Sequence, residues 1–313
     1  MKCTLGFLAL LAVSARTRAG PGRHEVHVGS PGSAHSLSLD QGGGENHSWS
    51  AQSDTLSPCL QVVKKADAGN NNEDEGKLTV AEQLEKANNN LNRYHDGIRI
   101  RDDIIVARHR TKRSTKPSTL HDRLWPKSSD GKVYIPYIIA NHYPSEELDI
   151  IKKGIDSFSS STCIRFLPRT TEKDFLYIQS LNGCYSYLGR QGYGQIVSLS
   201  LQGCIYLGTV QHELLHALGF NHEHCRSDRD QHVQVLLQNV MKGQDFNFKK
   251  VNTLNQETPY DYSSVMHYGR LAFSKDDHNP TMVAVPKSNS EFGTATEMNQ
   301  NDINRINLLY CSD

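Results

Sequence analysis

The stretch TVQHELLHALGFNHEHCRSDRD, residues 209–230, holds four histidines, two glutamates and a run of Arg and Asp. Placed on a helix at about 100° per residue, its apolar side chains form one stripe that can face a core. The stripe consists of Val210, Leu214, Ala217 and Leu218. His212 and His216, four residues apart, share the opposite face, so both imidazoles can reach one point.

A glycine and a third histidine follow this helix. Gly219 can adopt the left-handed conformation that ends a helix, and the turn can bring His222 back toward the same point. Three histidines with an open fourth position are typical of catalytic zinc sites, whereas structural sites are closed by four protein ligands. A polar helix face would explain a single histidine but not this combination. The stretch therefore predicts one bound zinc ion, with Glu213 as the base for a zinc-bound water.

The extended pattern HExxHxxGxxH resembles the signature of the astacin family of metzincin zinc endopeptidases. Glu223 after the third histidine and RSDRD (226–230) have the astacin form, and SSVMHY (263–268) resembles the astacin Met-turn. WPKSSDGKVYIPY (125–137) resembles the start of the mature domain in fish hatching enzymes and the related nephrosin. The resemblance, from Trp125 to Cys311, implies an α+β fold with two lobes. A twisted mixed sheet and helices form the N-terminal lobe, the C-terminal lobe is less regular, and zinc lies in the cleft between them.

The same resemblance implies roles for individual residues. Met266 would form an apolar floor beneath the zinc, and Tyr268 would be a further zinc ligand that swings away to stabilise the oxyanion. GYGQIVSLSL (192–201) would be the edge strand along which an extended protein substrate adds as another strand. The implied disulfides are Cys163–Cys311 and Cys184–Cys204.

Two features depart from the hatching-enzyme pattern. STKPSTLHDRLW (114–125) lacks the two extra cysteines of that subgroup, and Cys225 stands where the family usually has another residue. With Cys3 in the leader, Cys59 and Cys225 remain after the implied pairs are drawn. They could join each other, but we expect Cys225 to be a free thiol, since the surroundings of Cys59 offer no fixed geometry.

The N-terminal third has the composition of a leader and a pro-segment. Residues 1–19 contain an apolar run too short for a membrane span and read as a signal peptide, with cleavage after Ala15 as the alternative. We therefore expect a secreted, extracellular protein, with zymogen granules as one route. Residues 20–113 are expected to form a propeptide that is largely disordered, because residues 20–58 consist mainly of Gly, Ser, Pro and His and residues 69–76 are a polar, acidic tract. Within it, residues 78–91 can form one short amphipathic helix.

The catalytic domain is expected to span residues 114–313. Ser145 is the expected N-cap of a helix with apolar residues at helical spacing. Strands are expected within residues 132–140, 162–169, 174–180 and 195–201. Lys plus Arg total 34 and Asp plus Glu total 34, so no overall charge favours nucleic acid or an anionic membrane. No second apolar run can span a bilayer, and we expect a monomer.

A basic cluster precedes the catalytic domain. RTKR has the Arg-x-Lys-Arg form that furin-like convertases cleave, which predicts maturation between Arg113 and Ser114. A trypsin-like protease cutting after Arg108 or Arg110 is the alternative. In the family, the new amino group folds inward beside the glutamate after the third histidine, here Glu223.

Astacin pro-segments place an aspartate on the zinc in place of water. In IRIRDDIIVAR (98–108), Asp103 is the candidate and Asp102 the alternative, while a solvated Asp pair beside arginines is the simpler interpretation.

These features together predict a secreted zinc endopeptidase made as a zymogen. Egg-envelope proteins are the leading substrate class, a leukocyte or tissue protease is the competing role, and Lys287 is a candidate for a basic subsite. The alternative function is a catalytically silent, zinc-folded binding protein. A structural egg-envelope component would need repeats in the folded part, which are absent from the sequence.

Overall fold

The computed structural model describes residues 78–91, 93–95, 98–106, 123–286 and 290–312. All of them fall within a unit that runs from residue 71 to 313. Several sequence predictions concern residues outside the described ones: the signal peptide, Cys59, the Arg113–Ser114 junction and Lys287. None of the helices in the described part is long and apolar enough to cross a membrane.

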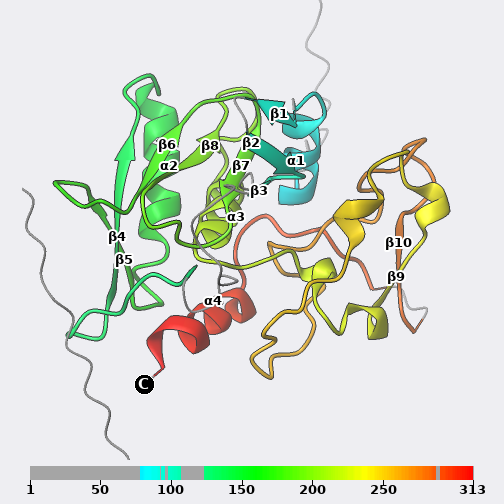
Figure 1. Ribbon diagram of the computed structural model, residues 1–313. Helices are drawn as coiled ribbons and strands as arrows, with labels where there is room; N and C mark the ends of the chain where they lie inside the picture. Colours follow the sequence, from blue (N-terminus) through cyan, green and yellow to red (C-terminus); the bar gives the residue numbers. More distant parts are fainter. Residues whose placement is uncertain (1–77, 92, 96–97, 107–122, 287–289, 313) are drawn as a thin grey trace, which may run out of the picture. The chain divides into compact units, whose positions relative to one another are not determined.

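An eight-stranded mixed sheet forms the N-terminal lobe, in the order β1-β2-β3-β7-β8-β6-β4-β5 (Figure 1). The strands are β1 (Tyr94–His95), β2 (Ile98–Arg101), β3 (Ile104–Val106), β4 (Val133–Ile139), β5 (Ile164–Pro168), β6 (Phe175–Gln179), β7 (Cys184–Tyr187) and β8 (Gly194–Leu199). Strands β5, β4, β6 and β8 run parallel, and β7 pairs antiparallel with β8. The four strands expected in the catalytic domain are confirmed as β4, β5, β6 and β8.

Helices α2 (Ser145–Asp156) and α3 (Leu207–Ala217) pack against each other and contribute to the main core. They approach closely at Gly154, where an added Cβ would lie 2.4 Å from Val210 Cγ1. The N-cap of α2 is Pro144 rather than the predicted Ser145, and no side chain caps it. Instead, the negative charges of Glu146 and Glu147 in the first turn interact favourably with the positive end of the helix dipole.

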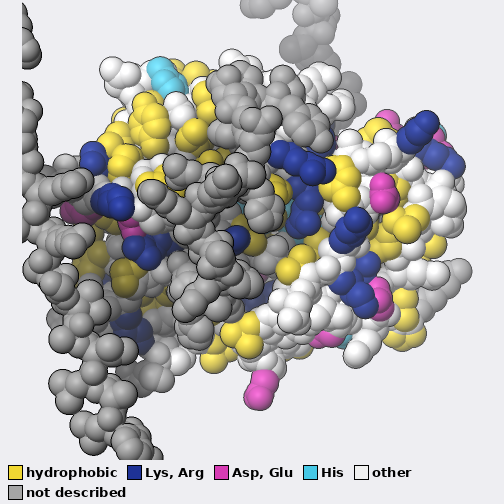
Figure 2. Space-filling model, in the orientation of Figure 1, with side chains coloured by type: hydrophobic (Ala, Val, Ile, Leu, Met, Phe, Trp, Pro, Cys, Tyr) yellow, Lys and Arg dark blue, Asp and Glu magenta, His cyan; other side chains and the backbone are white. Residues whose placement is uncertain are grey.

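The C-terminal lobe has little regular structure, as predicted. After α3 come η2 (Glu223–Cys225), η3 (Arg229–Gln231), β9 (Val233–Val235), η4 (Leu237–Asn239), η5 (Asp245–Phe248), β10 (Met282–Ala284), α4 (Gln300–Ile306) and η6 (Asn307–Cys311). A second, smaller core of mainly aromatic and aliphatic side chains lies here, and it includes Phe248, Tyr260 and Met282. Hydrophobic and charged side chains are interspersed over the face shown in Figure 2.

Side chains from both ends of the catalytic domain hold the end of α3. The Trp125 indole Nε1 donates to the Ala217 carbonyl at 2.9 Å, and the Tyr310 hydroxyl donates to the Leu218 carbonyl at 2.6 Å. These bonds satisfy carbonyls that a helix end leaves without intrahelical partners.

Among the described residues there are two disulfides, Cys163–Cys311 and Cys184–Cys204. The first joins the start of β5 to the C-terminal segment, and the second joins β7 to the loop before α3. Cys225 is buried and unpaired within the described part of the chain. Its pairing with Cys59 is untested, because Cys59 lies outside that part.

The described residues of the pro-segment contribute one helix and three strands. Helix α1 (Val80–Asn88) confirms the helix expected within residues 78–91, and Thr79 and Glu82 form its capping box. Strands β1 to β3 were not expected. Strand β3 pairs parallel with β7, so β7 is the strand that faces the pro-segment.

The prediction that residues 192–201 form an edge strand is wrong. Strand β8 lies inside the sheet between β7 and β6, and β7 is the outer strand of the catalytic domain on that side. The four residues of β7, CYSY, are too few to give a clear alternating pattern, so this strand was not predicted from the sequence.

Candidate active site

Three histidines meet as the helix and turn geometry predicts. His212 and His216 project from one face of α3, and Gly219, with φ of +103°, turns the chain back toward them. His222 follows the turn, and its Nε2 lies 3.2 Å from Nε2 of His216. All three imidazoles are buried.

Backbone carbonyls orient two of these rings. His212 Nδ1 lies 2.9 Å from the Val265 carbonyl, and His216 Nδ1 lies 2.8 Å from the Phe220 carbonyl. A carbonyl only accepts, so each Nδ1 carries the proton and each Nε2 is left with a lone pair. Burial lowers the pKa of both His216 and His222, to about 3 for His222, which favours the neutral, metal-binding form.

The carboxylate of Asp103 reaches the centre of the three rings. Its Oδ2 lies 3.0 Å from His212 Nε2 and 3.2 Å from His222 Nε2, and its Oδ1 lies 3.2 Å from His216 Nε2. Burial alone would raise its pKa, but the neighbouring His222 and His216 hold the pKa well below its usual range. Asp103 is therefore the negatively charged member of this cluster.

A tight hairpin places Asp103 there. Arg101 and Ile104 are paired across β2 and β3, so Asp102 and Asp103 form a two-residue turn. Asp102 has φ of +61°, a conformation that Asp tolerates in turns. The Asp102 carboxylate lies farther out, 3.6 Å from His222 Nε2. Burial and the charge of Asp103 raise its pKa.

The donor set fits a zinc ion. Unprotonated Nε2 atoms of His212 and His216 face carboxylate oxygens at 3.0–3.2 Å, so acceptors would face acceptors without a cation between them. Three imidazole nitrogens and one carboxylate oxygen are ligands that zinc takes in four-coordinate sites. His212, His216, His222 and Asp103 offer ligand atoms within 4.8 Å of one another.

Glu213 and Tyr268 lie beside this cluster. Both carboxylate oxygens of Glu213 and the Tyr268 hydroxyl are buried without a hydrogen-bond partner among the described residues. Burial raises the pKa of Glu213, and the charges of Asp103 and Asp102 raise it further. The Tyr268 ring centroid lies 4.5 Å from that of His222. Met266 is buried in the main core, and its carbonyl accepts from the Glu223 amide at 2.9 Å.

Asp302, which was not predicted from the sequence, anchors the Met-turn. Asp302, on α4, accepts from the Ser264 hydroxyl at 2.6 Å and from the Val265 amide at 3.1 Å. The Val265 carbonyl in turn accepts from His212 Nδ1. Asp302 therefore helps to orient His212, a candidate metal ligand, through Val265. The only sequence signal at Asp302 is a helix capping box with Asn299, which says nothing of this contact.

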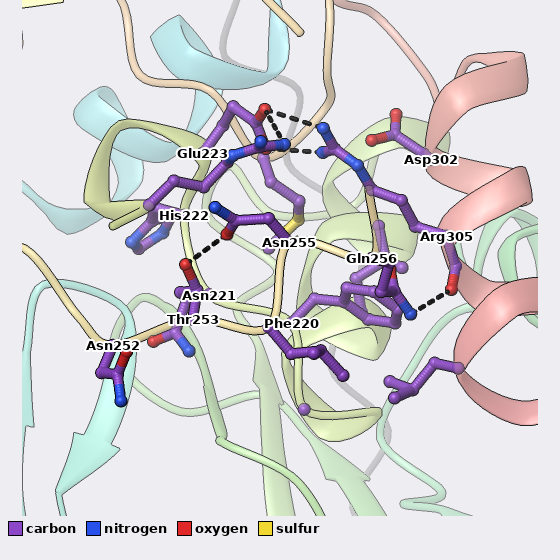
Figure 3. A pocket seen from close by; sticks show the side chains of 16 residues that line it. Phe220, Asn221, His222, Glu223, Asn252, Thr253, Asn255, Gln256, Asp302 and Arg305 are labelled. Carbon is purple, nitrogen blue, oxygen red and sulfur yellow. Dashed lines mark hydrogen bonds and ion pairs between the residues drawn. The ribbon is translucent and has the colours of Figure 1, made fainter. Parts of the chain in front are cut away.

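Glu223 sits in a charged network at a small cavity of about 140 Å³ (Figure 3). Arg305 binds it with two nitrogens, at 2.5 and 2.9 Å. Arg226 Nη1 lies 3.3 Å from it, and the Asp261 amide donates to it at 2.8 Å. Glu223 was a predicted site residue, whereas Arg226 entered only as part of the RSDRD run and Arg305 was not predicted.

Comparisons with known proteins find similar chains and one similar family model. The family model for Astacin (Peptidase family M12A) matches residues 119–311. High choriolytic enzyme 2 of Oryzias latipes is 43% identical over 224 residues, 72% of this chain and 78% of that one. Low choriolytic enzyme of the same fish is 46% identical over 186 residues, 59% of this chain and 68% of that one. The solved structure of High choriolytic enzyme 1, a hatching enzyme zinc-protease of Oryzias latipes, matches with a TM-score of 0.59 at 44% identity, covering 64% of this chain and 98% of that one.

Proposed function

This chain belongs to the astacin family, peptidase family M12A, and is a metalloendopeptidase, and from that premise we propose that one zinc ion held by His212, His216 and His222 makes it active. The observation that carries the proposal is that the Nε2 lone pairs of His212 and His216 point at the Asp103 carboxylate oxygens, which are also acceptors. Two ring nitrogens, fixed as acceptors by backbone carbonyls, point at one spot together with a third histidine.

A zinc ion bound there would polarise the scissile carbonyl and lower the pKa of a water molecule. Glu213 would take the proton of the attacking water and return it to the leaving amine, since its two oxygens have no other described partner. Tyr268, whose hydroxyl is equally free of described partners, would donate to the oxyanion. Met266 would close the site from below as an apolar residue. Water is the nucleophile, so no acyl-enzyme forms.

The chain is proposed to be a zymogen in which Asp103 occupies the fourth ligand position. Its two oxygens contact all three imidazoles. An attacking water therefore cannot bind at the metal position while the β2–β3 hairpin holds Asp103 there. Cleavage between Arg113 and Ser114, by a convertase or a trypsin-like protease, would break the covalent link between the hairpin and the catalytic domain, so that the hairpin can leave. The amino group of Ser114 would then join the Glu223 network, where Arg305 and Arg226 already bind the carboxylate.

Substrates are proposed to be extracellular proteins bound in extended form along β7. The support is the pro-segment itself, since the Ser186 amide of β7 donates to the Asp103 carbonyl at 2.9 Å and β3 continues the pairing. Egg-envelope protein is the leading substrate because relatives are named choriolytic enzymes. Secretion fits this role.

The test compares two substitutions in the activated protein. Glu213→Gln should abolish turnover of a quenched peptide and leave about one zinc per chain, because Glu213 is a base and not a ligand. His216→Ala should lose zinc and stability together, because metal binding is linked to folding. A Glu213→Gln protein that keeps most of its activity would contradict the assignment, and a wild-type protein that binds zinc without turnover would favour the silent binding protein.

A further inference from the structure

Helix α1 packs against α3 and bridges both lobes of the catalytic domain (Figure 1). On the C-terminal side, the Val80 amide donates to the Ala295 carbonyl at 2.8 Å. On the N-terminal side, the Thr209 hydroxyl at the start of α3 donates to Gln83 Oε1 at 2.7 Å in a buried contact. None of these residues contributes an atom to the metal cluster.

The last turn of α1 makes the most specific contact. The Asn88 side chain donates to the Cys184 carbonyl at 2.9 Å and accepts from the Cys184 amide at 2.8 Å. This amide group thus pairs with β7 as a neighbouring strand would. It satisfies two backbone groups at the edge of the catalytic sheet.

Four glycines of the catalytic domain lie beneath α1. We call this surface the glycine seat, and it consists of Gly183, Gly203, Gly208 and Gly269. A Cβ added to Gly208 would lie 2.5 Å from Val80 Cγ2, and one added to Gly183 would lie 2.5 Å from Asn88 Oδ1. The missing side chains let the helix approach the backbone of the catalytic domain directly.

The sequence of α1 matches the glycine seat on one face only. The buried or half-buried residues of this face recur at helical spacing: Val80, Gln83, Leu84, Ala87 and Asn88. Glu82, Glu85 and Lys86 are exposed on the other side. Val80 and Leu84 belong to the main core, so α1 completes that core rather than resting on its surface.

We propose that the glycine seat is a docking site for a short, N-capped helix, and that its occupant after cleavage is the pro-segment itself, residues 78–106. Inhibition by the docked pro-segment rests on the proposed function, because Asp103 is the residue that blocks the metal site. Two linked contacts, the helix on its seat and Asp103 at the cluster, bind more tightly than either alone, because the second becomes intramolecular. A single cut between residues 107 and 122 therefore leaves the enzyme latent until the helix departs.

The test uses the full-length protein, cut by limited proteolysis and freed of its pro-segment by gel filtration. A fluorescent synthetic peptide of residues 78–91, which lacks Asp103, should bind it in an anisotropy titration. Leu84→Ala in the peptide should weaken binding at least tenfold. Lys86→Ala, a matched change to Ala on the exposed face, should alter it less than twofold.

Inhibition of peptide hydrolysis completes the test. A peptide of residues 78–106 should inhibit at least tenfold more tightly than one of residues 98–106. Failure of peptide 78–91 to bind, or equal binding of its Leu84→Ala form, would overturn the docking site, as would equal inhibition by peptides 78–106 and 98–106. If peptide 78–91 binds but neither peptide 78–106 nor peptide 98–106 inhibits, the docking site stands and the Asp103 block of the proposed function fails.

Discussion

Replacing Glu223 by alanine should destabilise the protein by about 3 kcal/mol without removing zinc. The Glu223 and Arg305 side chains are 3% and 9% exposed, and removing one partner of a buried ion pair costs roughly 3–5 kcal/mol. The loss should lie near the lower limit, because Arg305 keeps its bonds to the Thr258 hydroxyl and the Pro259 carbonyl. Arg226 keeps Asp228 at 2.8 Å.

The assay is thermal unfolding of the full-length protein, with zinc content measured alongside. For a domain of 150–250 residues, about 3 kcal/mol corresponds to a fall in Tm of roughly 6–12 °C. Lys250→Ala is the control, since its 2.5 Å contact with Asp230 is as short but the side chains are 44% and 57% exposed. Exposed pairs contribute about 0–1 kcal/mol, so its Tm should fall little. Equal Tm losses in the two variants, or loss of zinc on Glu223→Ala, would refute the reasoning.

Three further predictions concern latency, maturation and the free thiol. Asp103→Ala should give activity in the uncut chain whereas Asp102→Ala should not, and a fully latent Asp103→Ala protein would mean that another group supplies the block. Arg113→Ala should slow or misplace maturation, and N-terminal sequencing of a fully active enzyme that starts upstream of residue 114 would contradict the assigned junction. Burial raises the pKa of Cys225 to about 12, so below that pH it stays a thiol and should resist iodoacetamide at pH 8 until the protein unfolds. A non-reducing peptide map that finds Cys225 linked to Cys59 would disprove the free thiol.

The parts of the site predictable from the sequence are those built from near neighbours. His212 and His216 are one helical turn apart, and Gly219 sets the turn that returns His222, so spacing alone brings the three together. The strands with long β-branched and aromatic runs were predictable for the same reason.

Long-range pairings left no such signal. Glu223 and Arg305 are 82 positions apart, and nothing in the local pattern around α4 marks that arginine as its partner. The hairpin that presents Asp103 was likewise missed: β2 and β3 are four and three residues long, below the length at which alternation separates a strand from a loop. Pairing with β7 places β3, and pairing with β3 places β2, so these strands depend on long-range and cross-strand contacts rather than on local propensity.

The bonds from Trp125 and Tyr310 to the end of α3 set limits on how the catalytic domain can be trimmed. The two residues come from opposite ends of that domain, yet both hold the helix that carries His212 and His216. A recombinant fragment that starts after Trp125, or stops before Tyr310, would leave a carbonyl at the end of that helix unsatisfied in the core. Tags and fusion partners therefore belong outside residues 125–311, where they also leave Cys311 free to close its bridge to Cys163.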